Sequence, residues 1–423
     1  MDNDPKSYKF IKETIKKDPP DRRKWILRCL LFVCAAVAFG LIAALTFAVA
    51  EPKFSAAVNG GEKVDIPSDE EPVPESEVTL QAESASTPSP TPTPTQAPAQ
   101  EITLEDYENL YQEMLAATEI PKRSLVTVIG IVNQMDYFNQ NYENQQQITG
   151  LIVAEKGQDL LIMTEYRIVE QVERIQVTFW DSSTVDAIYQ RHDANTGLTV
   201  LKVELAQLSE ATRDGMELAP LGNSYSVSQG DPVLAIGSPM GYSNSVAYGV
   251  VTSVTNKIST LDTEYNLLTT DILGSPEGSG ILINLEGEIV GIIAQTYSSD
   301  SKNIVTALAI SQIKSLIESL SNNEARPYIG IKGQDVTEEL SQRTGIPKGV
   351  LVNSVAEDSP AVFAGIMEYD VIVQIGEEKV QTLKQYQEQL GKCSPGQTVK
   401  VTAMRKGAEG YAEMEFTVTI GEI

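Results

Sequence analysis

A series of short β-type segments between Leu125 and Ala309 constrains the fold more than any other feature of the chain. Examples are LVTVIGIV, RIQVTFW and VAYGVVTSV, each bounded by Gly, Asn or Asp residues that favour turns. Many short strands with such turns predict a barrel or a sandwich rather than a parallel sheet. The run AISQIKSLIESL follows, and its isoleucines recur at helical spacing, so we expect a helix to close this domain.

A second unit of mixed pattern runs from Arg326 to Ile423. GVLVNSV and DVIVQIG predict strands, TLKQYQEQL predicts a helix, and TVKVTAMRKG with EFTVTI predicts a closing hairpin. We expect a small α+β module.

The N-terminal part contains an apolar run without charge from Cys29 to Ala50, long enough to cross a hydrocarbon core of about 30 Å. Lys and Arg residues precede it and acidic residues follow it, which keeps the N-terminus in the cytoplasm. We predict a cytoplasmic basic tail at 1–24 and a transmembrane signal anchor at 25–50, with everything after it extracytoplasmic. A buried core helix is the alternative.

Residues 51–101 are rich in Pro, Thr, Ser and acid and carry few large apolar groups. Such a segment cannot bury enough surface to offset its ordering entropy, so we predict a disordered linker. Beyond it, Thr103 and Asp106 have the spacing of a helix cap, and we expect a short amphipathic helix that packs on the following domain.

The charge balance excludes one class of partner. The chain has 32 basic and 58 acidic residues, a net charge of −26, and such a chain repels phosphate backbones, so nucleic-acid binding is not expected. With three cysteines, one histidine and no CxxC pair, neither a metal site nor a disulfide framework is indicated. No organic cofactor is indicated either.

Two segments carry a resemblance to a known family. The stretch at 219–241, APLGNSYSVSQGDPVLAIGSPMG, and the stretch at 270–292, TDILGSPEGSGILINLEGEIVGI, resemble the segments before and around the nucleophile of HtrA-type serine proteases. The last part of the chain resembles their PDZ domain. The resemblance implies a mainly β chain, with a trypsin-like double β-barrel at 102–323 and an α+β PDZ domain at 324–423. It also implies a possible homotrimer.

The resemblance places the catalytic nucleophile at Ser279, but the other two triad positions depart from the family. Arg167 stands where the histidine is expected, and Gly197 stands where the aspartate is expected. A serine hydroxyl needs a neighbouring group to accept its proton, and arginine stays protonated. Loss of the triad histidine costs on the order of 10⁶ in kcat in a serine protease, so we expect an inactive member.

The oxyanion hole is also altered, because Glu277 replaces a glycine whose backbone N–H is a donor in the family, and its carboxylate opposes a developing negative charge. Ile281 replaces a further glycine. The single histidine, His192, would have to swing in from a neighbouring turn to serve as base. Ser279 itself is either a tight turn kept for backbone geometry or part of a vestigial peptide pocket.

In the PDZ-like unit, the resemblance identifies Tyr328, Ile329, Gly330 and Ile331 as the strand and loop that would hold a peptide C-terminus. Leu383, Tyr386 and Leu390 share one face of the expected helix and could line the side-chain pocket, and the alternative for Tyr386 is plain core packing. Tyr369 stands where the family usually has glycine.

We therefore expect a membrane-anchored pseudoprotease that binds C-terminal or unfolded peptide segments in envelope protein quality control. One alternative is an active endopeptidase that uses Ser279 with His192 as a non-standard base. The other is an assembly subunit that uses the barrel for oligomerisation.

Overall fold

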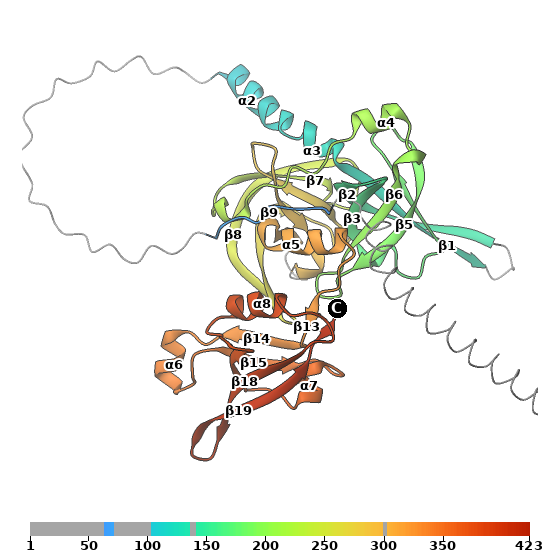
Figure 1. The fold of residues 1–423 in the computed structure, drawn as a ribbon. Coiled ribbons are helices and arrows are strands. Elements are labelled where there is room, and N and C mark those ends of the chain that lie inside the picture. Colours follow the sequence, from blue (N-terminus) through green and yellow to red (C-terminus); the bar gives the residue numbers. More distant parts are fainter. Residues whose placement is uncertain (1–62, 72–102, 136–140, 299–302) are drawn as a thin grey trace, which may run out of the picture. The chain divides into compact units, whose positions relative to one another are not determined.

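A computed structural model of the chain describes residues 63–71, 103–135, 141–298 and 303–423 (Figure 1). The expected tail at 1–24 and anchor at 25–50 lie outside these ranges, as does most of the expected linker at 51–101. Within the described ranges, no helix is long and apolar enough to cross a membrane.

Six antiparallel strands close the first barrel in the order β1-β2-β3-β6-β5-β4, with β4 pairing back onto β1. Their bounds are β1 Leu125–Met135, β2 Asn141–Lys156, β3 Asp159–Glu165, β4 Arg174–Thr178, β5 Thr184–His192 and β6 Leu198–Glu204. Short helical turns connect them or follow the last strand: η1 Tyr166–Ile168, η2 Leu205–Gln207 and α4 Glu210–Gly215.

The second barrel repeats this plan in the order β10-β11-β12-β9-β8-β7, with β7 pairing back onto β10. Its strands are β7 Pro232–Ser238, β8 Ser245–Thr260, β9 Thr263–Leu273, β10 Ser279–Ile283, β11 Ile289–Ile293 and β12 Ile304–Ala309. The single turns η3 Ser224–Ser226 and η4 Gln295–Tyr297 precede β7 and β12, respectively. The predicted double barrel is confirmed.

The two barrels share a hydrophobic core. Leu151, Met163 and Val200 of the first barrel join Leu234 and Ile281 of the second in one buried cluster. Helix α5 (Ile310–Ser321) adds its apolar face to this cluster, as its spacing predicted. Burial of each such aliphatic side chain stabilises the fold by about 1.5–3 kcal/mol. The serine segment therefore lies in a wall that is packed on both sides.

Residues 63–71 differ from the linker expectation, because they lie extended on the barrel domain. Val64 is buried in the shared core, and its backbone pairs with the Asn322 side chain at 3.1 and 2.8 Å. Asp69 lies 2.8 Å from the buried ammonium of Lys314 and accepts a hydrogen bond from Ser311 at 2.5 Å. The buried Val64 and the charge partner Asp69 give this short stretch the burial that the composition of the whole linker lacks.

Helix α2 (Leu104–Ala116) begins at the expected cap, where Thr103 and Asp106 bond each other's backbone N–H groups. Its C-terminal end packs on the barrel domain as expected, because Met114 and Leu115 lie partly buried against the shared core. The rest of the helix buries no residue and leaves Tyr107 and Leu110 exposed. The short helix α3 (Glu119–Arg123) then leads into β1.

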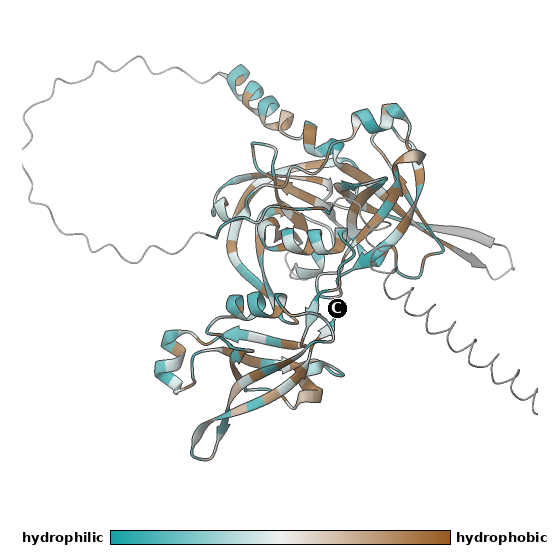
Figure 2. Ribbon diagram, viewed as in Figure 1, coloured by the Kyte–Doolittle hydropathy of each residue, from teal (hydrophilic) through white to brown (hydrophobic). Residues whose placement is uncertain are grey.

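The C-terminal unit is the expected α+β module. Its main sheet has the order β14-β15-β16-β18-β19, with β17 paired to β16, and β13 pairs with β20. The bounds are β13 Pro327–Tyr328, β14 Ile331–Asp335, α6 Glu338–Thr344, β15 Val350–Val355, α7 Pro360–Ala364, β16 Val371–Ile375, β17 Glu378–Lys379, α8 Leu383–Gly391, β18 Thr398–Gly407, β19 Gly410–Thr419 and β20 Gly421–Glu422. Hydrophobic and hydrophilic residues alternate along β18 and β19 (Figure 2), as one-sided burial requires.

Candidate functional site

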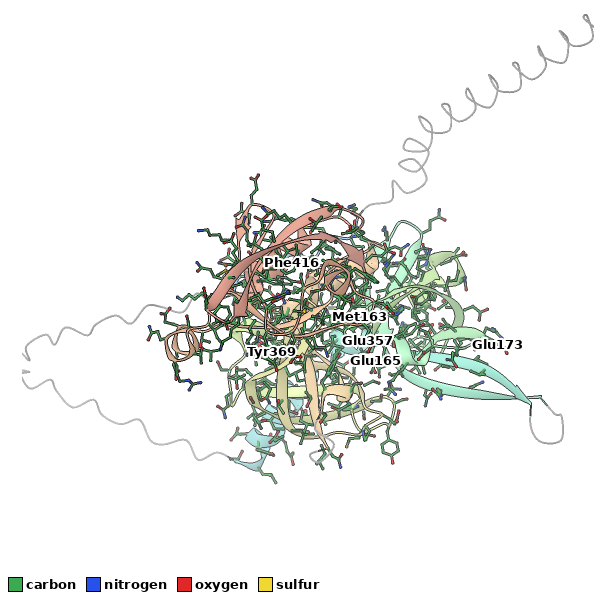
Figure 3. All side chains as sticks on the ribbon, turned by 90° about the horizontal axis from the view of Figure 1, so that it is seen from below. Met163, Glu165, Glu173, Glu357, Tyr369 and Phe416 are labelled. Atoms are coloured by element: carbon green, nitrogen blue, oxygen red, sulfur yellow. The ribbon has the colours of Figure 1, made fainter. Side chains whose placement is uncertain are left out.

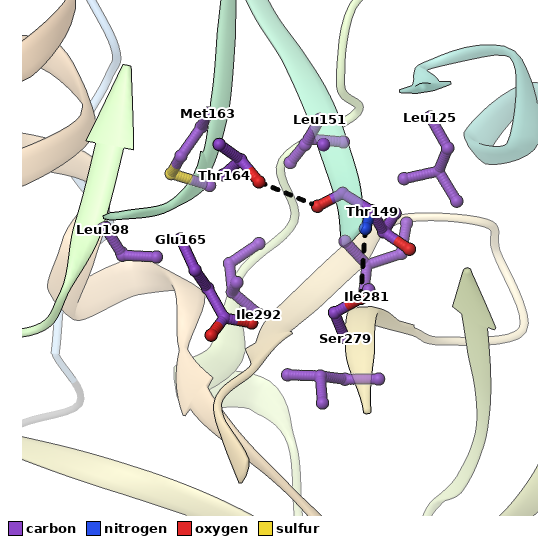
Figure 4. Close-up of a pocket in the computed structure, with 13 residues that line it drawn as sticks. Leu125, Thr149, Leu151, Met163, Thr164, Glu165, Leu198, Ser279, Ile281 and Ile292 are labelled. Atoms are coloured by element: carbon purple, nitrogen blue, oxygen red, sulfur yellow. Dashed lines mark hydrogen bonds between the residues drawn. The ribbon is translucent and has the colours of Figure 1, made fainter. Parts of the chain in front are cut away.

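Ser279 is the first residue of β10, and its hydroxyl is part of the barrel wall. The side chain is 2% exposed. Its Oγ accepts a hydrogen bond from the Thr149 backbone N–H at 3.1 Å (Figure 4). The same Oγ lies 2.7 Å from the Ser238 Oγ. Thr149 Oγ1 and Ser238 Oγ are 3.2 Å apart and complete a small hydroxyl cluster. The hydroxyl of Ser279 therefore links β2, β7 and β10.

The backbone around Ser279 explains why small residues surround it. Gly280 pairs with Gly237 across the β10–β7 ladder, and both have φ in the left-handed half of the map, at 128° and 120°. A Cβ on Gly280 would lie 2.1 Å from the Ile236 carbonyl oxygen. The two strands approach too closely here for any side chain, so this part of the loop has a structural reason for its glycine.

A small cavity adjoins Ser279. Its volume is about 20 Å³, room for about one water molecule, and its lining includes Leu151, Met163, Glu165 and Ile292 (Figure 4). Such a space is too small for a substrate side chain.

Arg167 lies in η1, directly after β3, and forms two ion pairs. Its Nε lies 2.7 Å from Glu165 Oε2, and its Nη1 lies 2.8 Å from Glu277 Oε2. Burial raises the pKa of the Glu165 carboxyl, and the hydrogen bond and charge of Arg167 oppose that shift. Glu165 is the last residue of β3, two positions after Met163 (Figure 3). The residues at the expected histidine and oxyanion-hole positions thus contact each other.

Gly197 ends a turn that begins at Asp193. Its φ is 71°, and its carbonyl accepts a hydrogen bond from the Tyr166 N–H at 2.7 Å. The nearby carboxylate of Asp193 is 1% exposed and has other partners: it accepts hydrogen bonds from Thr196 and lies 3.1 Å from Arg326 Nη1. The carboxylate of this turn, Asp193, therefore forms an ion pair with Arg326.

His192 has partners of its own. Its Nδ1 lies 2.6 Å from the Tyr189 hydroxyl, and its ring stacks on Tyr166 with centroids 3.8 Å apart and 10° between the planes. Among the described residues, the hydrogen-bond partners of the Ser279 hydroxyl are Thr149 and Ser238. The geometry does not pair His192 with Ser279.

In the C-terminal unit, the loop Tyr328–Ile331 connects β13 to β14. The backbone N–H groups of three consecutive residues, Ile329, Gly330 and Ile331, donate to the carboxylate of Asp262 at 2.8, 2.7 and 3.2 Å. Asp262 comes from the β8–β9 turn of the second barrel. The loop expected to hold a peptide C-terminus thus binds a side-chain carboxylate of the same chain.

Helix α8 packs into the core of the C-terminal unit, which is one of the two roles that the sequence left open. Leu383, Tyr386 and Leu390 are buried in the core of the C-terminal unit. The Tyr386 hydroxyl also donates to Asp262 Oδ1 at 2.5 Å. Burial and the neighbouring carboxylate raise the pKa of Tyr386 well above its ordinary value, so it stays a donor.

Tyr369, at the usual glycine position, has a φ of 71° and a largely exposed side chain (Figure 3). Left-handed backbone of this kind is the reason why glycine suits the position.

Sequence reasoning missed Thr149, Ser238, Glu165 and Asp262. Thr149 and Ser279 are 130 positions apart, and Asp262 and Tyr386 are 124 apart. No local motif marks such contacts. An aspartate in a short turn between two strands, as at Asp262, is an ordinary hairpin signal, so it does not indicate a contact elsewhere in the chain.

Two protein families match the chain. The family described as "Trypsin-like peptidase domain" matches residues 148–292, and the family described as "PDZ domain" matches residues 327–416. These ranges fall within the double barrel and the C-terminal unit, respectively.

Known proteins of similar sequence are HtrA and DegP-like proteases. A "Probable periplasmic serine endoprotease DegP-like" of Halomonas elongata is 30% identical over 65% of this chain and 56% of its own length. A "Serine protease Do-like HtrA" of Lactococcus lactis is 26% identical over 65% of this chain and 71% of its own length. The chain thus spans little more than half the length of the DegP-like relative.

Solved structures agree in fold. "HtrA-type protease AlgW with decapeptide" has a TM-score of 0.54 and 21% identity, and the match covers 73% of this chain and 98% of that one. A serine endoprotease of Yersinia pestis has a TM-score of 0.50 and 24% identity, with 74% and 98% covered. The chain thus has a trypsin-like double barrel followed by a PDZ domain, and it is similar in sequence to HtrA and DegP-like serine proteases.

Proposed function

We propose that the chain is a pseudoprotease, anchored in a membrane by residues 25–50 and extracytoplasmic from the linker onward, that binds peptides through its PDZ domain. Its place would be envelope protein quality control. The periplasmic relatives favour this location for the folded domains. The acidic chain favours neutral or basic peptide segments as ligands.

The observation that carries the loss of proteolysis is the ion pair between Arg167 and Glu277. A guanidinium remains protonated at biological pH and cannot take the serine proton. Glu277, whose carboxylate lies 2.8 Å from this guanidinium, is the residue expected at an oxyanion-hole position, and its negative charge opposes a developing oxyanion. The buried and bonded hydroxyl of Ser279 supports the same conclusion.

Peptide binding is supported by the loop at 328–331, whose three N–H groups converge on one carboxylate. A PDZ domain holds a peptide as an added strand, with such a loop at its end. A solved relative in fold contains a decapeptide. The exposed apolar residues of α2 are compatible with the homotrimer that the family resemblance implies.

The test uses the full chain with Ser279→Ala as its control. Both proteins are treated with a fluorophosphonate probe and, separately, with an unfolded protein substrate. We expect neither labelling nor cleavage from either protein, while both unfold cooperatively on heating. Labelling and cleavage that disappear in Ser279→Ala would establish an active endopeptidase and direct attention to His192 as its base.

A further inference from the structure

The turn between β8 and β9 places a buried carboxylate at the tip of a hairpin. The connection consists of Leu261 and Asp262, and Asp262 has a φ of 59°. A two-residue hairpin of this kind needs left-handed backbone, which aspartate tolerates. The turn geometry explains an Asp or Asn here. It does not explain why the side chain is only 5% exposed.

The contacts of Asp262 explain its burial. Oδ2 accepts hydrogen bonds from the N–H groups of Ile329 and Gly330 at 2.8 and 2.7 Å. Oδ1 accepts from the Ile331 N–H at 3.2 Å and from the Tyr386 hydroxyl at 2.5 Å. Four donors converge on the carboxylate, which fills the acceptor capacity of its two oxygens.

The backbone of Asp262 adds a fifth contact, because its own N–H donates to the Ile331 carbonyl at 2.6 Å. A peptide that adds a strand to β14 would use the same set of groups. Its terminal carboxylate would take the three loop N–H groups, and the N–H of its last residue would take the Ile331 carbonyl. Asp262 therefore occupies, within one chain, the position of the last residue of a bound peptide.

We infer that Asp262 is a built-in occupant of the carboxylate-binding loop, so that a free peptide C-terminus enters only when the β8–β9 hairpin leaves. The inference rests on the proposed peptide binding and adds its regulation. Both carboxylates need the same N–H groups, and those groups have no capacity for a second anion. Occupation by Asp262 and by a peptide terminus are thus mutually exclusive.

The consequence for affinity follows from competition. When only the open fraction of the protein accepts peptide, the apparent dissociation constant is the intrinsic one divided by that fraction. Hydrogen bonds to an ionised group are among the stronger ones, so removing the charge of Asp262 shifts the population toward the open form. An asparagine at position 262 keeps the turn geometry, but its side-chain NH₂ group faces the loop N–H groups, which are also donors, so some of these hydrogen bonds are lost.

The experiment compares the wild-type full chain, purified in detergent, with Asp262→Asn and with Glu264→Gln. Glu264 lies in the same hairpin and pairs with Lys257, so its variant changes a carboxylate to an amide away from the loop. The probe is a fluorescent pool of decapeptides with a free C-terminal carboxylate and a fixed apolar last residue. The same pool with C-terminal amides measures binding that does not use the loop.

We expect Asp262→Asn to bind the carboxylate pool about tenfold more tightly than the wild type and Glu264→Gln, which corresponds to the loss of one charge-assisted hydrogen bond. Without peptide, amide hydrogen exchange at 329–331 is expected to be faster in Asp262→Asn. Equal affinity in all three proteins, or unchanged exchange at 329–331, would overturn the inference and leave the proposed function in place.

Absence of binding by every protein, Asp262→Asn included, would instead overturn the proposed peptide binding, and the inference with it. If Asp262→Asn does not fold, Tyr386→Phe takes its place, because it removes one of the four donors and keeps the ring in the core. Its expected gain in affinity is smaller, about threefold, and no gain in this variant counts against the inference.

Discussion

Arg167 Nη1 lies 2.8 Å from Glu277 Oε2, so the residues expected at the histidine and oxyanion-hole positions of a serine protease contact each other. The family resemblance implies a base at the position of Arg167 and an oxyanion-hole glycine at the position of Glu277. Either charge by itself would oppose catalysis, and together they form a neutral pair over the serine loop.

The first prediction concerns the strength of this pair. The Glu277 side chain is 77% exposed, and exposed ion pairs contribute little to stability. A double-mutant cycle with Arg167→Ala and Glu277→Ala, followed by urea unfolding, is expected to give a coupling of at most about 1 kcal/mol. A coupling well above that value would assign the pair a structural role.

The second prediction is that restoring two triad residues does not restore catalysis. In Arg167→His with Gly197→Asp, the hydroxyl of Ser279 still lies in the barrel wall between Ser238 and the Thr149 N–H. We expect no fluorophosphonate labelling of this double variant, with trypsin labelled in parallel as the positive control. Stoichiometric labelling would mean that the hydroxyl turns outward readily.

The third prediction concerns Ser279 as a structural residue. Ser279→Ala leaves the Thr149 N–H without its acceptor in a buried wall, which costs about 1–3 kcal/mol of the free energy of unfolding. Chemical denaturation of the full chain measures the loss. Ser319→Ala, at a half-buried serine whose hydroxyl bonds the Ser315 carbonyl of its own helix, is the control and is expected to stay within about 0.5 kcal/mol of wild type.

The fourth prediction concerns Tyr369, whose φ of 71° is unfavourable for a side chain. Its N–H bonds the Val352 carbonyl at 2.8 Å, and glycine keeps that contact. We expect Tyr369→Gly to raise the free energy of unfolding by about 0.5 kcal/mol, because relief of strain exceeds the added entropy of the unfolded chain. Tyr369→Asn is expected to give a smaller gain, and a loss in both variants would refute the argument.

The fifth prediction is a pH dependence at Tyr297. Burial raises the pKa of its hydroxyl from 10.0 to about 12, and the hydroxyl donates to the Asn195 carbonyl at 2.9 Å. Above pH 10 the unfolded state releases this proton while the folded state retains it, so stability falls as pH rises from 10 to 12.

Tyr297→Phe lacks this titration and loses about 1 kcal/mol at pH 7 with its hydrogen bond. The difference in unfolding free energy between wild type and Tyr297→Phe is therefore expected to shrink as pH rises above 10. Denaturation curves at pH 7, 9, 10 and 11 measure it, and a difference that is constant with pH would contradict the prediction.

Local patterns in the sequence by themselves predicted a β-rich domain, an α+β unit and helix α5, and the resemblance to a known family implied the double barrel and the PDZ domain. Alternation of apolar residues with closely spaced turns defines strands, and a 3.6-residue period defines a helix. The sequence also determined that Arg167 and Gly197 supply neither base nor acid, since residue identity alone decides that. The cap at Thr103 was local as well.

Only the tertiary structure decided where the hydroxyl of Ser279 points, that Arg167 pairs with Glu277, and that Asp262 occupies the loop at 328–331. Composition predicts a linker through residues 63–71, because composition averages over a whole segment. In the structure, one buried valine and one partner for Lys314 are enough to hold these nine residues on the barrel domain. Each of these contacts joins residues far apart in the chain. The energies of these contacts depend on which donors and acceptors lie together in a buried space, and no local periodicity of the sequence predicts which of them do.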